Sequence, residues 1–393
     1  MRRLPTVILS ICCTAPCIAL LSSCGNRSNA PLPLSGGRTS RGLDHSEGAM
    51  YMANLRRTGF YDVEPVRILH GIRWKFVPGC ELLSIPVVSD GMVFVGGSDG
   101  KMRAIRADDG SLVWDFSTSA PIRTCPSVAD GTVFFGSLDR SFYAVSIDGK
   151  LVWSIPTNEE LYAPSYVHGG RVYFAGNGGT LYCTDMHSGD VIWTSRGEEP
   201  RLSLNAPSTD DGMIYLTSAE NEKVYIVDAS AGKVVHVFEG GPSATGTVSP
   251  AVDSGLVYYG GATMCAMDIR TRTRKWCFPR GNMYGSSPAV ANGSLYFASW
   301  ELGQGNPDFF AIDASNGEMK WSFRNGGSMG LPPAIARNVV YFGSHVDSKL
   351  YAVSASDGAP LWSLRTKGLI TPPVPADHVV YFVGMNGILY SVQ

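Results

Sequence analysis

One residue type recurs along this chain at a nearly fixed interval. The positions are Trp74, Trp114, Trp153, Trp193, His236, Trp276, Trp321 and Trp362, with the histidine filling the single gap in a tryptophan series. The intervals of 40, 39, 40, 43, 40, 45 and 41 residues are the period of a structural repeat. The length of 393 residues therefore does not reveal the number of domains, because a repeat array of this length can form a single domain.

A second marker repeats in step with the first. Each unit has a proline before a short apolar run, at Pro86, Pro126, Pro164, Pro207, Pro250, Pro288, Pro333 and Pro373. In residues 126–153, four runs rich in Val, Phe, Tyr and Trp are separated by "DG", "LDR" and "DG". These separators favour tight hairpin turns, so each unit is predicted to be a four-stranded antiparallel meander. Eight such units predict an all-β fold, an eight-bladed β-propeller.

The repeated tryptophan is interpreted as architectural. A large indole once per unit can wedge between neighbouring sheets, and His236 is expected to be a smaller packing substitute. The last unit, from Pro373 onward, offers only three strands, whereas "IRWKFV" at 72–77 is a tryptophan strand with no unit ahead of it. We therefore expect the Trp74 strand to complete the last blade, so that the propeller spans residues 72–393.

The N-terminus has the composition of a targeting segment. Residues 1–23 combine two arginines with an apolar stretch that is too short and too Pro-interrupted to span a membrane. "LSSCG" at 21–25 resembles a bacterial lipoprotein signal, which implies lipidation of Cys24; an ordinary cleaved signal peptide is the alternative. Residues 24–50 are predicted to be a flexible tether and 51–71 an irregular docking segment. Because Gly25 is not aspartate, the resemblance implies the outer membrane, facing the periplasm, if the cell has one.

Charge and cysteine content narrow the possible partners. A formal net charge of -2 gives no broad positive field, so nucleic acid is not expected as a partner. After the signal, five cysteines remain in a compartment that permits disulfides. Cys265 and Cys277 flank the predicted turn "IRTRT" symmetrically, so they could face one another across a hairpin. A disulfide and two separate buried thiols both remain open. The spacing of histidines and cysteines predicts no metal site.

"AIDASNGEMKW" (311–321) and "AVSASDGAPLW" (352–362) resemble the tryptophan motif of the pyrroloquinoline-quinone-type propeller repeat. The resemblance runs from about residue 72 to 393. This repeat occurs in two classes of protein. One is the quinoprotein dehydrogenases, which use the quinone, calcium, a catalytic aspartate and often a disulfide between adjacent cysteines. This chain lacks adjacent cysteines after its signal segment, and its aspartates lie mostly in "DG" turns. A non-enzymatic protein without a cofactor is therefore expected, with a quinone-dependent dehydrogenase or small-ligand binder as the alternative.

The other class is the lipoprotein subunit of the outer-membrane β-barrel assembly machinery, which this chain resembles in its signal, length and repeat number. In that family a Leu-Ser-Leu-Arg loop before a Ser-Ala-Pro segment contacts the barrel-forming partner. "RLSLNAPS" at 201–208 is similar, with Asn205 in place of the arginine. The resemblance implies partner binding by Arg201, Leu202, Leu204 and Asn205. The leucines could equally be core residues that flank a strand.

Further partner contacts are predicted from loop positions. Loops between the tryptophan strand and the next proline, and those between the second and third strands, open on one face of a propeller. Trp300 is the only tryptophan outside the repeat position and lies in the longest loop on that face, at 299–308. Arg123, Tyr162 and Tyr284 are expected on the same face, with solvated side chains as the alternative. We therefore predict a monomeric propeller within a complex: a lipid-anchored scaffold that binds another membrane or envelope protein.

Overall fold

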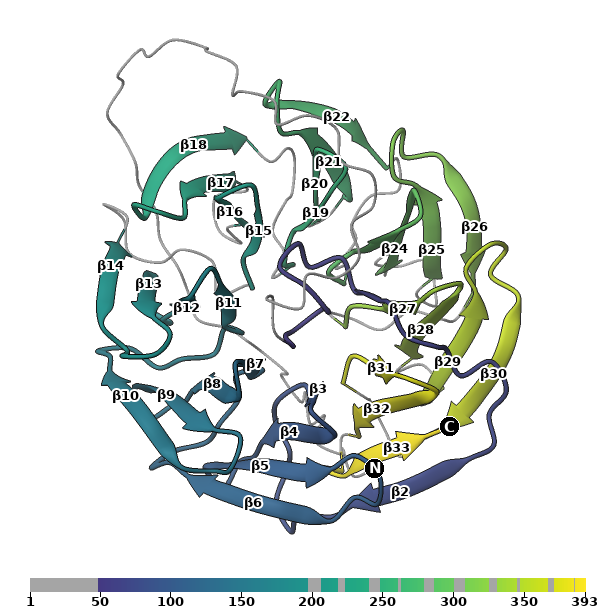
Figure 1. Ribbon diagram of the computed structural model, residues 1–393. Coiled ribbons are helices and arrows are strands. Elements are labelled where there is room, and N and C mark those ends of the chain that lie inside the picture. Colours follow the sequence, from purple (N-terminus) through teal and green to yellow (C-terminus); the bar gives the residue numbers. More distant parts are fainter. Residues whose placement is uncertain are drawn as a thin grey trace, which may run out of the picture.

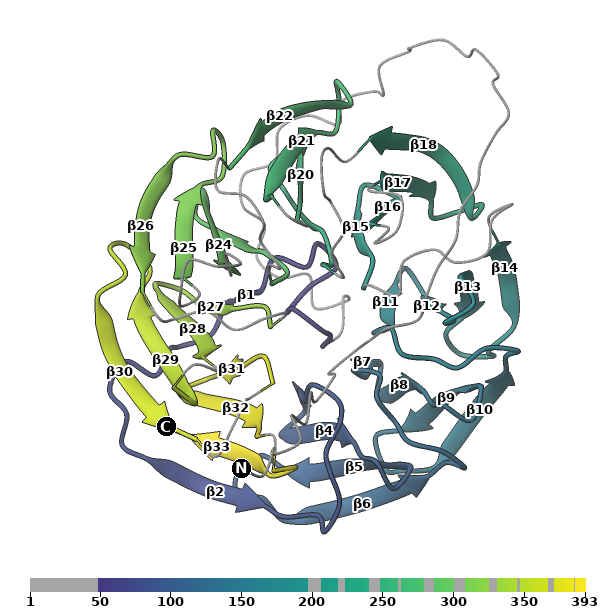
Figure 2. The same cartoon turned by 180° about the vertical axis from the view of Figure 1, so that it is seen from behind.

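The computed structural model shows sheets arranged radially around a central axis (Figures 1 and 2). It describes residues 49–196, 206–217, 223–239, 248–260, 263–278, 286–299, 308–324, 331–344, 347–366, 371–384 and 386–393. Eight sheets form the ring, so the predicted eight-bladed propeller is confirmed. Each blade is built from four antiparallel strands, with the innermost strand nearest the axis.

The first four blades follow the chain without interruption in strand order. Their strands are, in blade 1, β3 (Val87–Ser89), β4 (Met92–Gly96), β5 (Lys101–Arg106) and β6 (Leu112–Ser117); in blade 2, β7 (Ser127–Ala129), β8 (Thr132–Gly136), β9 (Ser141–Ser146) and β10 (Leu151–Pro156); in blade 3, β11 (Tyr166–His168), β12 (Arg171–Ala175), β13 (Thr180–Asp185) and β14 (Val191–Arg196); and in blade 4, β15 (Ser208–Asp210), β16 (Met213–Thr217), β17 (Lys223–Asp228) and β18 (Lys233–Glu239).

The last four blades include the two N-terminal strands. Their strands are, in blade 5, β19 (Ala251–Asp253), β20 (Leu256–Tyr259), β21 (Cys265–Asp268) and β22 (Thr273–Cys277); in blade 6, β23 (Ala289–Ala291), β24 (Ser294–Ser299), β25 (Asp308–Asp313) and β26 (Met319–Phe323); in blade 7, β27 (Ala334–Ala336), β28 (Val339–Ser344), β29 (Lys349–Ser354) and β30 (Pro360–Arg365), joined by β1 (Phe60–Tyr61); and in blade 8, β31 (Val374–Ala376), β32 (Val379–Val383), β33 (Leu389–Val392) and β2 (Ile72–Phe76).

Tight turns set the register of each blade. Between β7 and β8, Asp130 and Gly131 have φ angles of 45° and 65°, the left-handed pair that a two-residue hairpin turn needs. Strand side chains then alternate between the two faces of a sheet, and both faces meet a neighbouring blade. Phe142 of blade 2 stacks on Phe174 of blade 3 with ring centroids 3.9 Å apart. The core therefore lies between blades.

The repeated tryptophans lie at these interfaces. Each indole Nε1–H donates a hydrogen bond of 2.7 to 3.2 Å to a backbone carbonyl outside its own blade. The donor–acceptor pairs are Trp74–Ala107, Trp114–Ile147, Trp153–Met186, Trp193–Ala229, Trp276–Ala314, Trp321–Ala355 and Trp362–Val66. Six of these bonds tie one blade to the next, and the Trp362 bond ties blade 7 to the segment that precedes β2, so the repeat motif has a structural role at each of these seams.

The glycine of each motif faces the indole of the preceding blade. A Cβ placed on Gly317 would lie 2.7 Å from the Trp276 ring of the preceding blade, and one on Gly232 would lie 2.5 Å from Trp193. Both glycines have positive φ angles, of 78° and 66°. At the seam between blades 4 and 5 both partners change together, because His236 replaces tryptophan and Arg272, with φ of 58°, replaces glycine.

The N-terminal strand closes the ring as the sequence predicts. β2 pairs antiparallel with β33, with Trp74 opposite Ser391 and Phe76 opposite Leu389. Blade 8 has no turn that joins its third and outer strands, because the outer strand comes from the other end of the chain. The Val66 carbonyl occupies the place that such a turn has elsewhere, and it accepts the Trp362 indole N–H at 2.8 Å.

Residues 49–66, called the strap from here on, begin inside the ring and then run outward, since Glu64 O accepts from His378 N in the β31–β32 turn and Val66 O accepts the Trp362 indole N–H. Figures 1 and 2 show this first described segment, in purple, at the centre of the ring before the chain runs out to β2 at the rim. Within the strap, β1 pairs parallel with β27. The sequence predicts only an irregular docking segment here, and the structure gives the segment its partner, which is the innermost layer of the propeller.

Blade 5 carries a cross-strand disulfide. Cys265 in β21 and Cys277 in β22 are register partners and form a disulfide over a separation of 12 residues. Among the described cysteines, Cys125 and Cys183 are buried free thiols and Cys80 is a half-buried one. The bond joins the third and outer strands of one blade and does not link blades.

Candidate partner-binding face

The connections between blades open on one face of the ring. In an up-and-down blade, the loop between the second and third strands and the connection from the outer strand to the next blade leave the sheet at the same end. We call this end the connector face. The β4–β5 and β8–β9 turns belong to it, as do the connections β6–β7 and β10–β11. Backbone bonds join these layers, since Leu138 N donates to Pro121 O at 3.0 Å.

Two predicted contact residues lie on this face in the described part of the chain. Arg123 is exposed in the β6–β7 connection, directly after Ile122, which is fully buried. Tyr162 is half-buried in the β10–β11 connection, directly after Leu161, which is 1% exposed. The buried residue anchors each connection, and the next side chain is carried outward on two consecutive blades. The Tyr162 hydroxyl donates to Glu160 Oε2 at 2.7 Å.

The remaining predicted contact residues lie outside the described residues. These are Arg201, Leu202, Leu204, Asn205, Tyr284 and Trp300, together with the predicted lipidation site Cys24. The described part of the chain fixes where their loops begin and end. The 197–205 segment joins β14 to β15, and the 300–307 segment joins β24 to β25. Both connections are of the kinds that open on the connector face.

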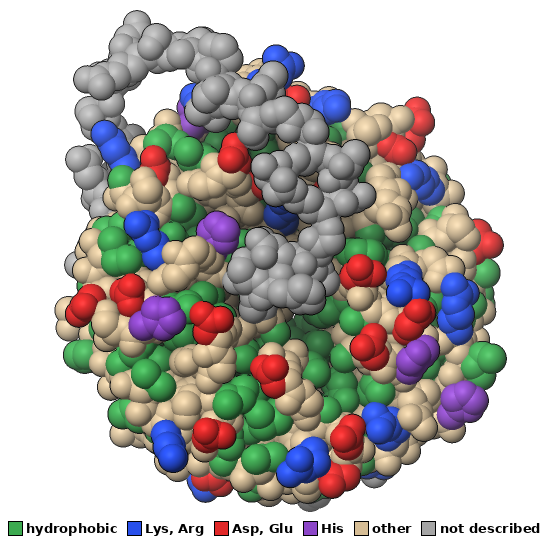
Figure 3. Space-filling view, in the orientation of Figure 1, with side chains coloured by type: hydrophobic (Ala, Val, Ile, Leu, Met, Phe, Trp, Pro, Cys, Tyr) green, Lys and Arg blue, Asp and Glu red, His purple; other side chains and the backbone are tan. Residues whose placement is uncertain are grey.

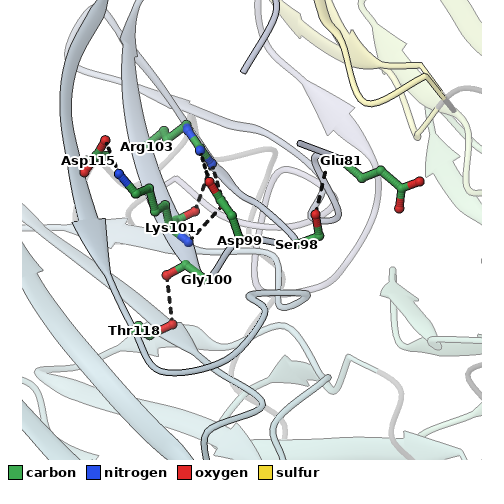
Figure 4. A network of polar contacts seen from close by, with 8 residues as sticks. All are labelled: Glu81, Ser98, Asp99, Gly100, Lys101, Arg103, Asp115 and Thr118. Atoms are coloured by element: carbon green, nitrogen blue, oxygen red, sulfur yellow. Dashed lines mark hydrogen bonds and ion pairs between the residues drawn. The ribbon is translucent and has the colours of Figure 1, made fainter. Parts of the chain in front are cut away.

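A charged clamp supports the face at blade 1 (Figure 4). Arg103 on β5 is 4% exposed, and its Nη1 donates to Asp99 Oδ1 at 3.0 Å in the β4–β5 turn. Its Nη2 forms a second, shorter bond with Asp99 Oδ2. Nearby, Lys101 Nζ lies 3.0 Å from Asp115 Oδ2, and Thr118 Oγ1 donates to Gly100 O at 2.9 Å. The β4–β5 turn is thus held by bonds to Arg103 and Thr118, with the Lys101–Asp115 ion pair beside it.

Blades 2 and 7 use tyrosine where blade 1 uses Arg103. Tyr143 donates to Asp139 at 2.8 Å, and Tyr351 donates to Asp347, again four residues apart. Sequence reasoning missed this clamp. Its signal is the aspartate shared by these three blades, with arginine in place of tyrosine in "SDGKMR" at 98–103.

The electrostatics of the clamp are those of a satisfied ion pair. Burial alone would raise the pKa of Asp99, but the hydrogen bond and charge of Arg103 hold it below its ordinary value. Burial would likewise lower the pKa of Arg103, and Asp99 raises it instead. Burial raises the pKa of the neighbouring Cys80 thiol, so this thiol is neutral at pH 7. The cluster therefore holds a turn in place and offers neither a free base nor a thiolate.

The described residues contain neither a metal-binding cluster nor a helix that could span a membrane. Within the described ranges, no three His, Cys, Asp or Glu side chains gather as a metal site requires. Over the same ranges, no helix is long and apolar enough to cross a membrane. Figure 3 shows acidic and basic side chains scattered among apolar and neutral ones on the visible face.

The blades are four-stranded meanders arranged around an axis, and hydrogen bonds from the repeated tryptophans join them. These features define the chain as a propeller of the pyrroloquinoline-quinone-like repeat class. The sequence matches the family model described as "Outer membrane protein assembly factor BamB" over residues 70–164, 148–277 and 261–393. The chain belongs to this family.

Individual relatives agree with this assignment. Outer membrane protein assembly factor BamB of Yersinia pestis is 28% identical over 218 residues, which cover 50% of this chain and 51% of that protein. The match thus spans about half of that relative. BamB from Moraxella catarrhalis has a TM-score of 0.68 at 15% identity, covering 83% of this chain and 100% of that one. Quinohemoprotein alcohol dehydrogenase from Comamonas testosteroni has a TM-score of 0.70 at 13% identity, covering 88% and 80%. The last two likenesses show the fold alone.

Proposed function

We propose that this protein is a lipid-anchored scaffold that assists the assembly of outer-membrane β-barrel proteins by binding another envelope protein. The observation that carries the proposal is membership of the BamB family over residues 70–393. The connector face supports it, because buried anchors such as Ile122 and Leu161 present the next side chain outward from a rigid blade. A rigid ring that presents adaptable loops suits a binding role better than a catalytic one.

The anchor is part of the proposal. Cys24 carries the lipid, and the protein sits at the outer membrane on its periplasmic side. Growth with an alkyne fatty acid should label the wild-type chain and leave Cys24→Ala unlabelled. The Cys24→Ala protein should also leave the membrane fraction on extraction. If Cys24→Ala keeps both the label and the membrane association, another residue carries the anchor.

The partner contact is assigned to the connector face. Arg201, Leu202, Leu204 and Asn205 form one contact loop, and Trp300, Arg123, Tyr162 and Tyr284 add to the same surface. Two leucine-to-glutamate changes two residues apart introduce charge into an apolar contact, which costs several kcal/mol of binding when the contact is buried. We therefore expect Leu202→Glu with Leu204→Glu to abolish the interaction.

The test is an in-cell crosslink followed by a mild-detergent pull-down and mass spectrometry. The matched control is Leu151→Glu with Val152→Glu on β10, where the side chains are 52% and 49% exposed at the rim. We expect a membrane-embedded assembly protein with wild type and control, and its loss with the Leu202 and Leu204 variant. Recovery of that protein with all three would place the contact elsewhere, and recovery with none would refute the assembly role.

A quinone-dependent dehydrogenase is the alternative from another class, and the likeness to the alcohol dehydrogenase supports it at the level of fold only. The residues do not fit the cofactor. Within the described ranges, no carboxylate cluster is available for calcium, and the disulfide joins Cys265 to Cys277, which are cross-strand partners and not adjacent residues. The alternative predicts quinone binding in the presence of calcium, which absorbance titration measures directly.

A further inference from the structure

The strap is hydrogen-bonded to the innermost layer of blade after blade. Ala49 exchanges two 2.8 Å bonds with Val128 of blade 2. Four strap carbonyls then accept 2.8 Å bonds from successive inner strands, in the pairs Leu55–Thr209 (blade 4), Arg56–Val252 (blade 5), Thr58–Val290 (blade 6) and Gly59–Ile335 (blade 7). Glu64 O accepts from His378 N of blade 8 at 2.9 Å. Within 16 residues the strap therefore makes main-chain bonds to six blades.

The two remaining blades meet the strap through side chains. Met50 and Leu55, each 4% exposed, pack with Ala163 and Tyr166 of blade 3. Tyr51 and Met52 pack in the cluster that contains Val87 of blade 1. The channel wall thus surrounds the strap as a receptor surrounds a bound peptide, with main-chain bonds for affinity and side-chain contacts for specificity.

Arg57 is the anchor of the strap. Its side chain is fully buried, yet its hydrogen bonds go to carbonyl oxygens: Nε to Pro207 at 3.1 Å, Nη1 to Tyr51 and Nη2 to Ser165 at 3.5 Å. The guanidinium carbon lies 5.5 Å from the Tyr51 ring centroid and 5.9 Å from that of Tyr166. Burial lowers the pKa of Arg57 to about 10, so it stays charged at neutral pH. Carbonyl dipoles and ring faces solvate this cation.

The residues after Arg57 fix the geometry of the strap. Asn54 Nδ2 donates to Thr58 Oγ1 at 2.6 Å, and Thr58 N donates back to Asn54 Oδ1 at 3.2 Å. Gly59 has φ of 64°, and a Cβ there would lie 2.8 Å from Ala289 Cβ and 3.0 Å from Pro333 O. Only glycine satisfies both conditions. The recognised core is therefore the tripeptide Arg57–Thr58–Gly59.

We propose that the channel wall is a peptide-binding site and that residues 49–66 are its ligand, held there independently of the covalent link to the ring. The ligand class is a peptide that folds into tight turns, with Arg57 and Gly59 at positive φ angles of 54° and 64°, around an Arg-Thr-Gly core. The link itself is exposed, because Ile68 is 71% exposed and Arg67 and His70 lie at the surface. The link bonds the ring only at its own surface positions, through Arg67 to Asn338 and through His70 and Gly71 to Gln393 O, so the strap contacts above are separate from it.

The position of the strap also determines where the segment that leads to the proposed anchor, Cys24, meets the ring. Ala49 lies against the inner strand of blade 2, so the tether joins the ring at its channel and not at its rim. If Cys24 carries lipid, the membrane pulls on the strap and not on β2.

The test cuts the link and asks whether the strap remains bound. A specific protease site is inserted between Arg67 and Gly71 of the soluble Cys24→Ala protein, with a fluorophore on the N-terminal side. After cleavage we expect the labelled fragment to coelute with a ring whose circular dichroism is unchanged. Excess synthetic peptide 49–66 should displace it, and the same peptide with Arg57→Met should need at least about 30-fold more, because truncating a buried charged anchor weakens binding by that order.

The control peptide carries Arg56→Ala, because Arg56 bonds Asp210 at the surface with half of its side chain exposed. We expect it to compete within about threefold of the parent peptide, as for an exposed ion pair. Release of the fragment from a folded ring on cutting, or unfolding of the ring, would overturn the proposal. Equal competition by the Arg57→Met and parent peptides would overturn the assignment of Arg57 as the anchor.

Discussion

The seam between blades 4 and 5 lacks both the indole and the glycine that the other described seams of this type share. Replacing His236 by tryptophan alone should not repair it. At the equivalent seams, a Cβ on the glycine would lie 2.5 to 2.8 Å from the preceding indole, and Arg272 has such a Cβ. Overpacking of this kind costs about 1–3 kcal/mol, which offsets the burial of the larger ring.

Replacing Arg272 by glycine alone has a smaller effect. Arg272 has φ of 58°, and a non-glycine residue in this left-handed region costs roughly 1 kcal/mol. Glycine removes that strain and leaves the histidine loosely covered. The two changes together recreate the usual seam, in which an indole that buries its ring contributes about 2–3 kcal/mol and its N–H gains an acceptor.

The double variant should therefore be about 2 kcal/mol more stable than the sum of the single effects predicts, which is within the range of coupling between contacting residues. The assay is urea unfolding of the four soluble proteins, followed by fluorescence, with unchanged slope as the check that the unfolding transition is comparable. The matched control pairs His236→Trp with Gly317→Ala at a distant seam. Additivity within about 0.5 kcal/mol for His236→Trp with Arg272→Gly would refute the reasoning.

Three further predictions follow from other contacts. Trp321→Phe removes the 3.0 Å bond to Ala355 and part of the ring, so it should lower the unfolding free energy by about 2 kcal/mol in urea titrations. Hydrogen bonds from Ser315 lower the pKa of Asp313 from 3.8 to about 2, so its stabilisation is complete above pH 4 and lost as pH falls toward 2. Asp313→Asn should therefore match wild type near pH 2 and be less stable above pH 4, by thermal unfolding at each pH. Replacing Cys265 and Cys277 by alanine removes a bond over 12 residues and should cost about 2–3 kcal/mol relative to oxidised wild type, with a similar loss in dithiothreitol-treated wild type as the control.

Repetition made the ring predictable from sequence. A tryptophan every 40 residues or so, with a glycine four residues earlier, appears in enough copies to identify the blade and the strand that Trp74 contributes to blade 8. Symmetry about a predicted turn placed Cys265 opposite Cys277 in the same way. The blades and the cysteine pair follow from local pattern, since they are built from short-range hairpins, and the place of the Trp74 strand follows from the strand that the last unit lacks.

Single-copy features could not be predicted. Arg57 lies in an irregular stretch, and its burial depends on carbonyls of Pro207 and Ser165, which are over 100 residues away in sequence. Val66 accepts the Trp362 indole because the chain ends where a turn should be, a consequence of ring closure. Arg103 stands where blades 2 and 7 have tyrosine, and the single arginine at this repeat position has no pattern of its own. Contacts of this kind form only when the whole ring is assembled, so the local sequence does not predict them.

The central claim is that the connector face binds an envelope protein, and site-specific photocrosslinking in cells tests it most directly. Benzoylphenylalanine at Arg123 and at Tyr162 should each give a crosslinked adduct with the same envelope protein, because both positions lie on that face of adjacent blades. The same probe at Leu151, which is exposed at the rim, should give none. An adduct from Leu151 and none from Arg123 or Tyr162 would contradict the account.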